Sequence, residues 1–385
     1  MRKPSRILVV DDESGMLRAV DRVLGATHRV VGIQSSVRAV AAAAEFNPDL
    51  VILDVRMPEM DGFELMARLK STDPAPDIIL MTGSIDDMDQ KLIRALRGRA
   101  FYFIQKPFDR EVLLTLVERC LELRWRREEN RLHTRRLEKE LGEARAFQQG
   151  LLPDRDMTTD RLAICCRYVS CSELGGDLYD YTMLPGGRAA LIIADVVGHG
   201  VSAAMLTGVV KSAFRASDAD EYDPSAVVQR VRSNLSAFGP ERFVTLIAAL
   251  LAPDGNLRYV NAGHPAGLLW RADGAVQRLT STGPLVSPAL PPCIWEQQTV
   301  PMDPGDQLLL YTDGISDTLA GEQDLGDEPL VASIAKHREG GLPLLDALLS
   351  QVRARLAGRP QPDDLTLLTA KVLAGGADRV SAIRP

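Results

Sequence analysis

The sequence contains no hydrophobic run long enough to cross a membrane. Its longest apolar stretch, Val244 to Ala252, is interrupted by Thr245 and is far shorter than the ~18 residues that a membrane span needs. The opening residues place only the short apolar run Ile7 to Val10 before two aspartates, whereas a secretory signal needs a longer one. We therefore expect a cytoplasmic protein with no membrane partner.

The sequence also lacks a cysteine pattern typical of disulfides or metal sites, and it has no excess of positive charge. The five cysteines form no CxxC pair, which favours free thiols in a reducing compartment. Lysine and arginine total 45 against 52 aspartate and glutamate residues, for a formal net charge of −7. A mildly acidic chain lacks the electrostatic footprint of strong nucleic-acid binding, so we expect no nucleic-acid partner. At roughly 150 residues per domain, the 385 residues predict two or three domains.

Residues 1–121 alternate short apolar runs with amphipathic stretches. The runs are ILVV (7–10), RVVGI (29–33), LVIL (50–53), DIILM (77–81) and FYFI (101–104). Strands that alternate with helices predict an α/β domain with a doubly wound, parallel, five-stranded sheet of the flavodoxin-like kind.

Residues 122–150 are dominated by charge and predict one long helix that links two domains. A heptad runs into it from the preceding helix, at Leu113, Leu116, Cys120, Leu123, Arg127, Asn130, Thr134, Leu137, Leu141, Ala144, Gln148 and Leu151. Its ends are apolar and its centre is polar. Sustained a/d spacing favours a coiled coil, and polar a/d residues weaken one. We expect a homodimer through this linker, with a lone solvated helix as the alternative.

Residues 151–374 combine longer apolar runs with turn signals. The runs are ALIIAD (190–195), FVTLIAALL (243–251), LRYVNAG (257–263) and QLLLYTD (307–313). Asp254-Gly255 and Asp273-Gly274 are dipeptides that favour hairpins. With helical patterns between the runs, this region predicts an α+β domain, an antiparallel β-sandwich flanked by helices. Residues 375–385 predict a frayed tail.

Polar residues follow the strands of the first predicted domain at the point where each strand ends. Asp11 and Asp12 follow the first strand, Asp54 the third, Thr82 the fourth and Lys106 the fifth. Ligands of open α/β sheets bind beyond the carboxyl ends of the strands, so these side chains should converge. Clustered carboxylates need a cation, and oxygen ligands suit Mg²⁺. A carboxylate can then attack a phosphoryl group, whose charge a lysine and a metal neutralise.

This first region resembles the receiver domain of bacterial response regulators over its whole length. The matching motifs are VVDD (9–12), DVRMPEMDGFEL (54–65), MTG (81–83) and KPF (106–108). The resemblance implies that Asp54 accepts a phosphate from a sensor histidine kinase. It also implies that Asp11, Asp12 and Asp54 hold Mg²⁺ together with the backbone carbonyl of Arg56.

The same resemblance gives roles to three residues near the later strands. It implies that Thr82 and Lys106 contact the phosphoryl group, and that the bond from Lys106 to Pro107 is cis, which proline permits. Phe103 matches the aromatic switch position of the family. The alternative for Phe103 is an ordinary core residue of a strand.

Aspartates recur beside glycines in the C-terminal region. They lie in the motifs GGDLYD (175–180), IADVVGHG (193–200), LLYTDG (309–314) and PDDLT (362–366). A single Asp-Gly is more often a turn, but several aspartates without Cys or His partners suit Mg²⁺ or Mn²⁺ and not Zn²⁺. Two such ions can activate a water and hold a transferring phosphoryl group.

The ordered set of motifs resembles the PPM-type metal-dependent Ser/Thr phosphatases, related to protein phosphatase 2C, and among them the bacterial SpoIIE-type group. The resemblance covers about 150–372 and implies two Mn²⁺ or Mg²⁺ ions. The implied ligands are Asp177, Asp195, Asp313, Asp364 and the backbone carbonyl of Val196. It further implies direct attack by a metal-bound hydroxide, without a phosphoenzyme.

Two departures from the group's pattern stand out. Pro284-Leu285-Val286 replaces a PLG sequence, and neither Arg161 nor Arg167 matches the phosphate-binding arginine of the animal enzymes. The phosphate of a substrate would then rest on the metals alone. Two histidines in family motifs, His199 and His264, read as structural.

Together these features predict a two-component response regulator whose output is protein serine/threonine phosphatase activity. The resemblance implies a phosphorylated STAS-type anti-sigma-factor antagonist as substrate, within a partner-switching pathway. The alternative is a catalytically weak, phosphatase-fold adaptor that binds a sigma factor or its regulator. A diguanylate cyclase is disfavoured because Leu178-Tyr179 follow Gly175–Asp177, where that enzyme class has Glu-Phe.

Overall fold

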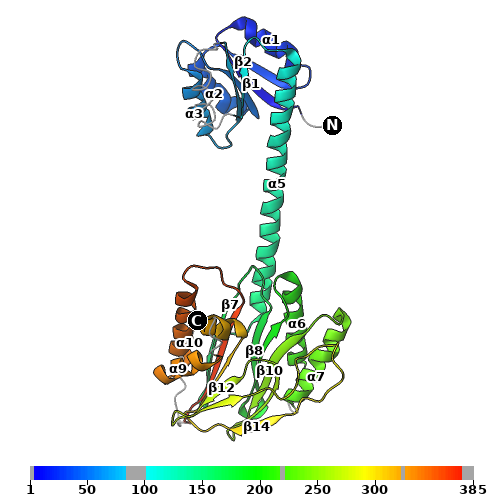
Figure 1. Ribbon diagram of the computed structural model, residues 1–385, viewed down its shortest axis with the longest axis vertical. Coiled ribbons are helices and arrows are strands. Elements are labelled where there is room, and N and C mark those ends of the chain that lie inside the picture. Colours follow the sequence, from blue (N-terminus) through cyan, green and yellow to red (C-terminus); the bar gives the residue numbers. More distant parts are fainter. Residues whose placement is uncertain (1–3, 84–100, 217–221, 322–325, 375–385) are drawn as a thin grey trace. The chain divides into compact units, whose positions relative to one another are not determined.

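The structure is a computed structural model that describes residues 4–83, 101–216, 222–321 and 326–374. Its contacts divide the chain into two compact units, Met1–Leu137 and Glu138–Pro385, and the helix α5 (Arg110–Leu151) begins in the first and ends in the second (Figure 1). In the described part, no helix is both long and apolar enough to span a membrane. The predicted frayed tail, 375–385, lies outside the described residues.

The first unit is a parallel five-stranded sheet, which confirms the predicted α/β class. The strand order is β2-β1-β3-β4-β5, and every pairing is parallel. The central strands are buried throughout, as expected where helices cover both faces of a parallel sheet. The elements are β1 (Arg6–Val10), α1 (Ser14–Leu24), β2 (Arg29–Ile33), α2 (Ser36–Phe46), β3 (Leu50–Asp54), α3 (Gly62–Lys70), β4 (Asp77–Thr82), β5 (Tyr102–Gln105) and the start of α5.

The linker is helical, as predicted, and its first turns belong to the core of the first unit. Leu113, Val117 and Cys120 are fully buried there. Farther on, the guanidinium Nη2 of Arg127 donates to Oδ2 of the buried Asp77 at 2.6 Å. Arg127 is a central heptad position, so at this point the predicted seam is occupied by a contact within the unit. Coiled-coil pairing remains a prediction.

The second unit is an antiparallel β-sandwich flanked by helices, which confirms the predicted class. The two sheets have the orders β14-β11-β10-β9-β8 and β13-β12-β15-β16-β7-β6. The strands are β6 (Asp156–Thr158), β7 (Leu162–Val169), β8 (Asp177–Leu184), β9 (Arg188–Val196), β10 (Val244–Leu251), β11 (Asn256–Ala262), β12 (Gly267–Trp270), β13 (Val276–Leu279), β14 (Gln298–Pro301), β15 (Gln307–Tyr311) and β16 (Leu365–Val372).

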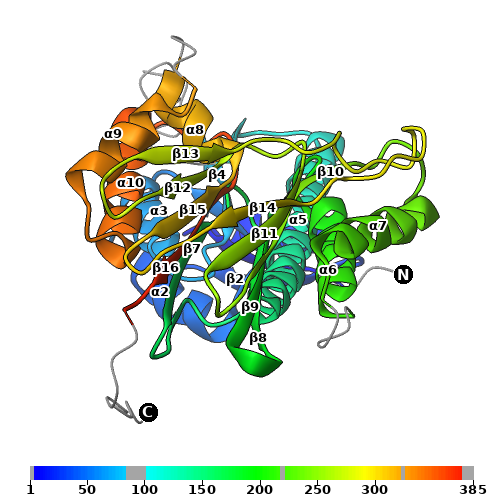
Figure 2. The same ribbon diagram turned by 90° about the horizontal axis from the view of Figure 1, so that it is seen from below.

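Helices cover the outer face of each sheet (Figure 2). The helices α6 (Val201–Arg215) and α7 (Pro224–Leu235) pack on the first sheet. The second sheet carries α8 (Asp313–Ala320), α9 (Glu328–Lys336) and α10 (Gly341–Leu356).

The strand β9 shows why this sandwich needs long apolar runs. Leu191 and Ile193 face the other sheet, whereas Ile192 and Ala194 face the helices, because successive strand residues point to opposite faces. Both faces are buried, so an uninterrupted apolar run is required. Asp195 continues the parity of Leu191 and Ile193, which directs it toward the side where the two sheets meet.

The predicted hairpin turns are present. Asp254-Gly255 joins β10 to β11, and Asp273-Gly274 joins β12 to β13. Gly255 and Gly274 have φ angles of 83° and 97°, a conformation that glycine adopts without steric cost.

Candidate functional site

The predicted site of the first unit comes together at the carboxyl ends of its strands. Asp11 follows β1, and Asp54 is the last residue of β3. Carboxylate oxygens of Asp11, Asp12 and Asp54 lie within 4.8 Å of one another. Asp11 is fully buried and Asp54 is 6% exposed, whereas Asp12 is exposed to solvent. An all-oxygen donor set open on one side fits a hard cation such as Mg²⁺, which keeps several of its waters.

Lys106 holds two of these carboxylates. Its Nζ lies 2.5 Å from Oδ2 of Asp11 and 2.9 Å from Oδ1 of Asp54. Burial raises the pKa of the Asp54 carboxyl, and the hydrogen bond from Lys106 opposes that shift. The backbone N–H of Lys106 donates to the carbonyl of the buried Thr82 at 2.7 Å, and its bond to Pro107 is cis, as the resemblance implies.

The remaining predicted residues of this unit lie around that cluster. Phe103 is half-buried and packs against the core that includes residues of α2 and α3. The side chain of Arg56 is exposed, two residues beyond β3. Gly62 lies so close to the Asp54 carbonyl that a Cβ there would collide with it. The chain from β3 to α3 is thus folded tightly against the end of the strand.

The predicted aspartates of the second unit gather at one end of the sandwich, from both sheets. Asp177 and Asp195 are direct partners across β8 and β9, so their side chains lie on the same face. Asp313 follows β15 at the start of α8, and Asp364 precedes β16. The hydroxyl of Thr366 on β16 donates to Oδ2 of Asp177 at 2.5 Å, which joins the two sheets at this end.

Two of these carboxylates are buried hydrogen-bond acceptors. Oδ2 of Asp177 also accepts from Oγ1 of Thr312 at 2.8 Å. Asp364 accepts from the backbone N–H groups of Cys171 at 2.7 Å and Gly176 at 2.6 Å. Burial, followed by the charge of the neighbouring Asp195, raises the pKa of the Asp177 carboxyl well above its usual range.

Three other carboxylates, those of Asp195, Asp313 and Asp363, interact through their charges and remain open to solvent in part or in full. Burial raises the pKa of Asp195 to about 7, and the charges of Asp313, Asp363 and Asp364 add to this shift. Burial also raises the pKa of Asp313, and Asp363 is the largest charged contributor. The raised pKa values of Asp195 and Asp313 show that their carboxylates, together with that of Asp363, repel one another electrostatically. Among the described residues none of them forms an ion pair with a lysine or arginine.

Asp363 is the residue that the sequence interpretation missed. The motif PDDLT offers two adjacent carboxylates, and strand parity distinguishes them. Thr366 and Asp364 point toward the space between the sheets, while Asp363 is exposed. The sequence did contain a signal for this choice. Side chains alternate between the two faces of β16, and the even-numbered residues Leu368 and Ala370 point into the core, as Asp364 and Thr366 do.

The donor set of this end of the sandwich fits divalent cations that prefer oxygen. The ligands on offer are carboxylates together with backbone carbonyls, and the carbonyls of Val196 and Gly198 lie beside Gly176. The hydroxyl of Tyr168 is buried and has no hydrogen-bond partner in the described part of the chain. Burial and the charge of Asp364 raise its pKa, so this hydroxyl stays protonated as a free donor.

His264 has a structural position in the second unit. His264 is 5% exposed, and burial lowers its pKa to about 3, so the ring is neutral. Its Nδ1 lies 2.8 Å from Oγ1 of Thr245 and its Nε2 lies 3.1 Å from the carbonyl oxygen of Tyr311. A neutral ring satisfies both by accepting at Nδ1 and donating at Nε2. His199 is exposed.

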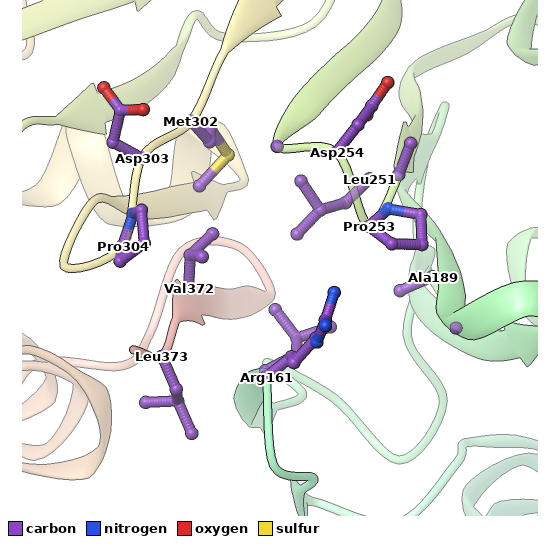
Figure 3. A pocket seen from close by; sticks show the side chains of 14 residues that line it. Arg161, Ala189, Leu251, Pro253, Asp254, Met302, Asp303, Pro304, Val372 and Leu373 are labelled. Atoms are coloured by element: carbon purple, nitrogen blue, oxygen red, sulfur yellow. The ribbon is translucent and has the colours of Figure 1, made fainter. Parts of the chain in front are cut away.

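A cavity of about 380 Å³ lies elsewhere and contains none of the predicted site residues (Figure 3). Ala189, the second residue of β9, and Val372, the last residue of β16, line it. Asp195 and Asp364 lie at the opposite ends of those strands. Arg161 lines this cavity as well, and Arg167 pairs with Asp346 at 3.2 Å. Neither arginine serves the aspartate cluster, in agreement with the sequence analysis.

Comparisons with known proteins agree with both units. Residues 7–118 match the response regulator receiver domain family, and residues 185–373 match the family of stage II sporulation protein E (SpoIIE). The chain is 27% identical over 259 residues to protein IcfG of Synechocystis sp., which is 60% of this chain and 41% of that protein. It is 32% identical over 197 residues to phosphoserine phosphatase RsbP of Bacillus subtilis, 49% of this chain and 47% of that protein.

The chain therefore spans less than half the length of these two curated relatives. Among solved structures, the SiaA-PP2C domain of Pseudomonas aeruginosa is similar with a TM-score of 0.54 at 21% identity. That match covers 62% of this chain and 98% of the other, and it supports the fold of the second unit. The chain thus joins a response regulator receiver domain to a SpoIIE-type phosphatase domain of the PP2C fold.

Proposed function

We propose that this protein is a metal-dependent protein serine/threonine phosphatase under the control of its receiver domain. The observation that carries the proposal is the set of carboxylates from both sheets at one end of the sandwich, with no basic side chain paired to Asp195, Asp313 or Asp363 in the described residues. Like charges held together without a partner are costly. A bound cation offsets that cost, and RsbP, which carries the name of a phosphoserine phosphatase, is a relative.

We assign the binding of two Mn²⁺ or Mg²⁺ ions to Asp195, Asp313 and Asp363, with the Val196 carbonyl, and to Asp177 and Asp364 behind them. Such ions supply an activated water and neutralise phosphoryl oxygens when bound. Asp177 and Asp364 tie the sheets and the loop together through the hydrogen bonds described above.

For the first unit we propose that Asp54 accepts a phosphoryl group from a sensor histidine kinase. Asp11, Asp12, Asp54 and the Arg56 carbonyl would hold one Mg²⁺. The Lys106 ammonium, which contacts both Asp11 and Asp54, is in place to contact a phosphoryl oxygen. A phosphoryl group on Asp54 would add negatively charged oxygens with which the Lys106 ammonium can pair. Phosphorylation commonly acts by creating such a charge pair.

As substrate we propose a phosphorylated STAS-type anti-sigma-factor antagonist. The support is the similarity to RsbP and the sequence motifs of the SpoIIE-type group. In the part of the chain that the structure describes, no arginine forms an ion pair with Asp195, Asp313 or Asp363, so the phosphoserine or phosphothreonine would bind through the metals.

We also propose that the chain forms a homodimer through α5. Leu137, a heptad position, is 45% exposed and available to a partner helix. Analytical ultracentrifugation should show a dimer that Leu137→Lys weakens, because a charged residue at a seam position disfavours pairing. A monomer at tens of micromolar would contradict this part of the proposal.

Phosphate release from a phosphorylated STAS protein, measured with and without Mn²⁺, tests the proposed function. We expect Mn²⁺-dependent release that EDTA abolishes and that beryllofluoride, an acyl-phosphate mimic, changes. Binding of the partner without phosphate release at any Mn²⁺ concentration would support the adaptor alternative and overturn the enzymatic proposal.

A further inference from the structure

The cavity of about 380 Å³ in the second unit is lined by residues of the core between the two sheets (Figure 3). Leu162 of β7, Ala189 of β9, Leu251 of β10 and Met302 beyond β14 belong to that core, and each is 6% exposed or less. Native cores leave few voids larger than a water molecule, whereas small-molecule sites are largely apolar cavities of about this volume. The cavity therefore has the size and the lining of a ligand site.

The small side chain of Ala189 leaves room for this cavity. Ala189, Leu191 and Ile193 lie on the same face of β9, and the two later positions carry larger side chains. Across the sheet, Ala189 is paired with Leu251 of β10. A larger side chain at position 189 would therefore extend into the cavity.

Arg161 brings a positive charge to these apolar walls. Its backbone is held on both sides, because its N–H donates to Oγ1 of Thr159 at 3.3 Å and its carbonyl accepts from the N–H of Leu373 at 2.8 Å. Figure 3 shows its side chain extending into the cavity. Within the described residues, the guanidinium has no ion pair and no hydrogen-bond acceptor. Arg161 is exposed to solvent, so an anion from solution can reach it.

Two carboxylates at the rim of the cavity limit the charge that a ligand can carry. Asp254 and Asp303 line the cavity, and Figure 3 shows their carboxylates directed away from it. The hairpin holds Asp254 in this orientation, because Oδ2 of Asp254 accepts from Nδ2 of Asn256 at 2.9 Å. Both carboxylates leave Arg161 available, but they repel further negative charge near the rim. A ligand with a single negative charge fits this arrangement.

We propose that this cavity binds a small organic monocarboxylate with an apolar body. Its carboxylate pairs with the Arg161 guanidinium, whose N–H groups match the two carboxylate oxygens. Its apolar body leaves water and packs against Leu251 and Met302, a transfer that the hydrophobic effect favours. The site lies at the other ends of β9 and β16 from Asp195 and Asp364, and its occupation does not depend on phosphatase activity.

The test measures octanoate binding to the full-length protein by calorimetry, with EDTA present so that octanoate cannot bind through a metal. Arg161→Gln removes the charge, and Ala189→Leu fills the cavity. Arg167→Gln is the matched control, because Arg167 is an arginine of β7 that does not line the cavity. Octylamine reverses the charge of the probe, acetate removes its apolar body, and citrate adds negative charge. The methyl NMR signal of Met302, assigned with Met302→Leu, reports whether octanoate enters the cavity.

We expect saturable octanoate binding that shifts the Met302 methyl signal. Arg161→Gln and Ala189→Leu should each weaken this binding by about tenfold or more, equivalent to ~1.4 kcal/mol, whereas Arg167→Gln should match the wild type. Octylamine, acetate and citrate should each bind about tenfold more weakly than octanoate, or not at all.

Octanoate binding that does not saturate at millimolar concentrations overturns the proposal. Equal affinities of Arg161→Gln and Arg167→Gln overturn it as well, as does octylamine binding as tight as that of octanoate. Binding that leaves the Met302 signal unchanged has the same consequence, because octanoate then lies elsewhere on the protein. If circular dichroism shows that Ala189→Leu does not fold, the exposed Arg161 and the Met302 signal decide the outcome.

Discussion

The two carboxylate sites of this chain differ in how their negative charge is balanced. In the first unit, the Lys106 ammonium lies between Asp11 and Asp54. In the second, Asp195, Asp313 and Asp363 share a negative field, and no ion pair reaches them in the described part of the chain. The first site thus carries an internal counter-charge, while the second depends on what it binds.

This difference suits the roles proposed for the two sites. A switch must be stable both with and without a phosphoryl group, and a lysine that can exchange partners provides that stability. A hydrolytic centre needs charge where a phosphoryl group arrives, and protein-held cations supply more of it than a side chain does.

The largest effect is expected at Asp195. Asp195→Asn removes a charge from the centre of the proposed metal set and should lower kcat/KM by roughly 10³-fold or more, equivalent to ~4 kcal/mol of transition-state stabilisation. The fold should persist, because the substitution also relieves repulsion with Asp313 and Asp363. The check is steady-state phosphate release with Mn²⁺, alongside circular dichroism. A variant with more than about a tenth of wild-type activity would contradict the metal assignment.

Substitutions at Asp363 and Asp364 should both weaken metal binding, but they should differ in their effect on stability. Asp363→Asn should weaken Mn²⁺ binding and lower activity by about 10²-fold at limiting metal with little change in melting temperature, because this side chain is exposed and its charge acts on Asp195. Asp364→Asn should destabilise the unit by about 1–3 kcal/mol, since an amide cannot accept all of the backbone N–H groups that the carboxylate accepts.

Calorimetric Mn²⁺ titration and thermal unfolding distinguish these two variants. The reverse pattern, with a destabilised Asp363 variant and a stable Asp364 variant, would contradict the structural role given to Asp364.

Much of this comparison was predictable from the sequence. The two fold classes follow from the spacing of apolar runs, and the receiver cluster follows from polar residues placed after β1, β3 and β5. Asp363 was missed because a motif with two adjacent aspartates does not reveal which one points outward. That choice depends on the parity of β16 and on the position of Asp177 across the sandwich, which only the packed sheets define.

The linker shows a second limit of sequence interpretation. The heptad pattern was visible, but it could not indicate that Arg127 contacts Asp77 or that Gln148 contacts Gly175. Heptad spacing indicates which residues share a face of a helix, but it does not show which residues pack against that face. In this chain, Asp77 contacts that face of α5 at Arg127, and Gly175 contacts it at Gln148.

The response to phosphorylation should be a smaller effect. We expect beryllofluoride to raise phosphatase activity at least fivefold, equivalent to ~1 kcal/mol of coupling, because phosphate-like charge at Asp54 draws Lys106 and Thr82 toward it. Asp54→Ala should reduce this ratio to one. The ratio of initial rates with and without the mimic is the measurement, and a ratio that persists in the Asp54 variant would place the effect of the mimic elsewhere.

The smallest expected effect is a pH dependence of stability in the metal-free protein. The pKa of Asp195 is about 7 in the folded chain against an ordinary value of 3.8, so the folded state binds more protons between these limits. Stability is then present at low pH and is lost as pH rises toward 7. Melting curves with EDTA should shift downward by a few degrees from pH 5 to pH 7.5.

Excess Mn²⁺ should remove or reverse this trend, because the metal takes the place of the protons. Asp195→Asn should reduce this trend in EDTA and leave the part that Asp177 and Asp313 contribute, because burial raises their pKa values as well. Lys106→Gln, which removes the counter-charge of the receiver site, should leave the trend in place. A trend that is lost in the Lys106 variant and kept in the Asp195 variant would mean that the receiver site causes it.

Calorimetric titration of Mn²⁺ into the full-length protein, paired with phosphate release from a phosphoserine protein in the same samples, tests the central claim most directly. We expect Mn²⁺ binding that persists in Asp54→Ala, is lost in Asp195→Asn, and rises in step with phosphate release. Phosphate release that survives in Asp195→Asn, or Mn²⁺ binding to the second unit without any release, would contradict it.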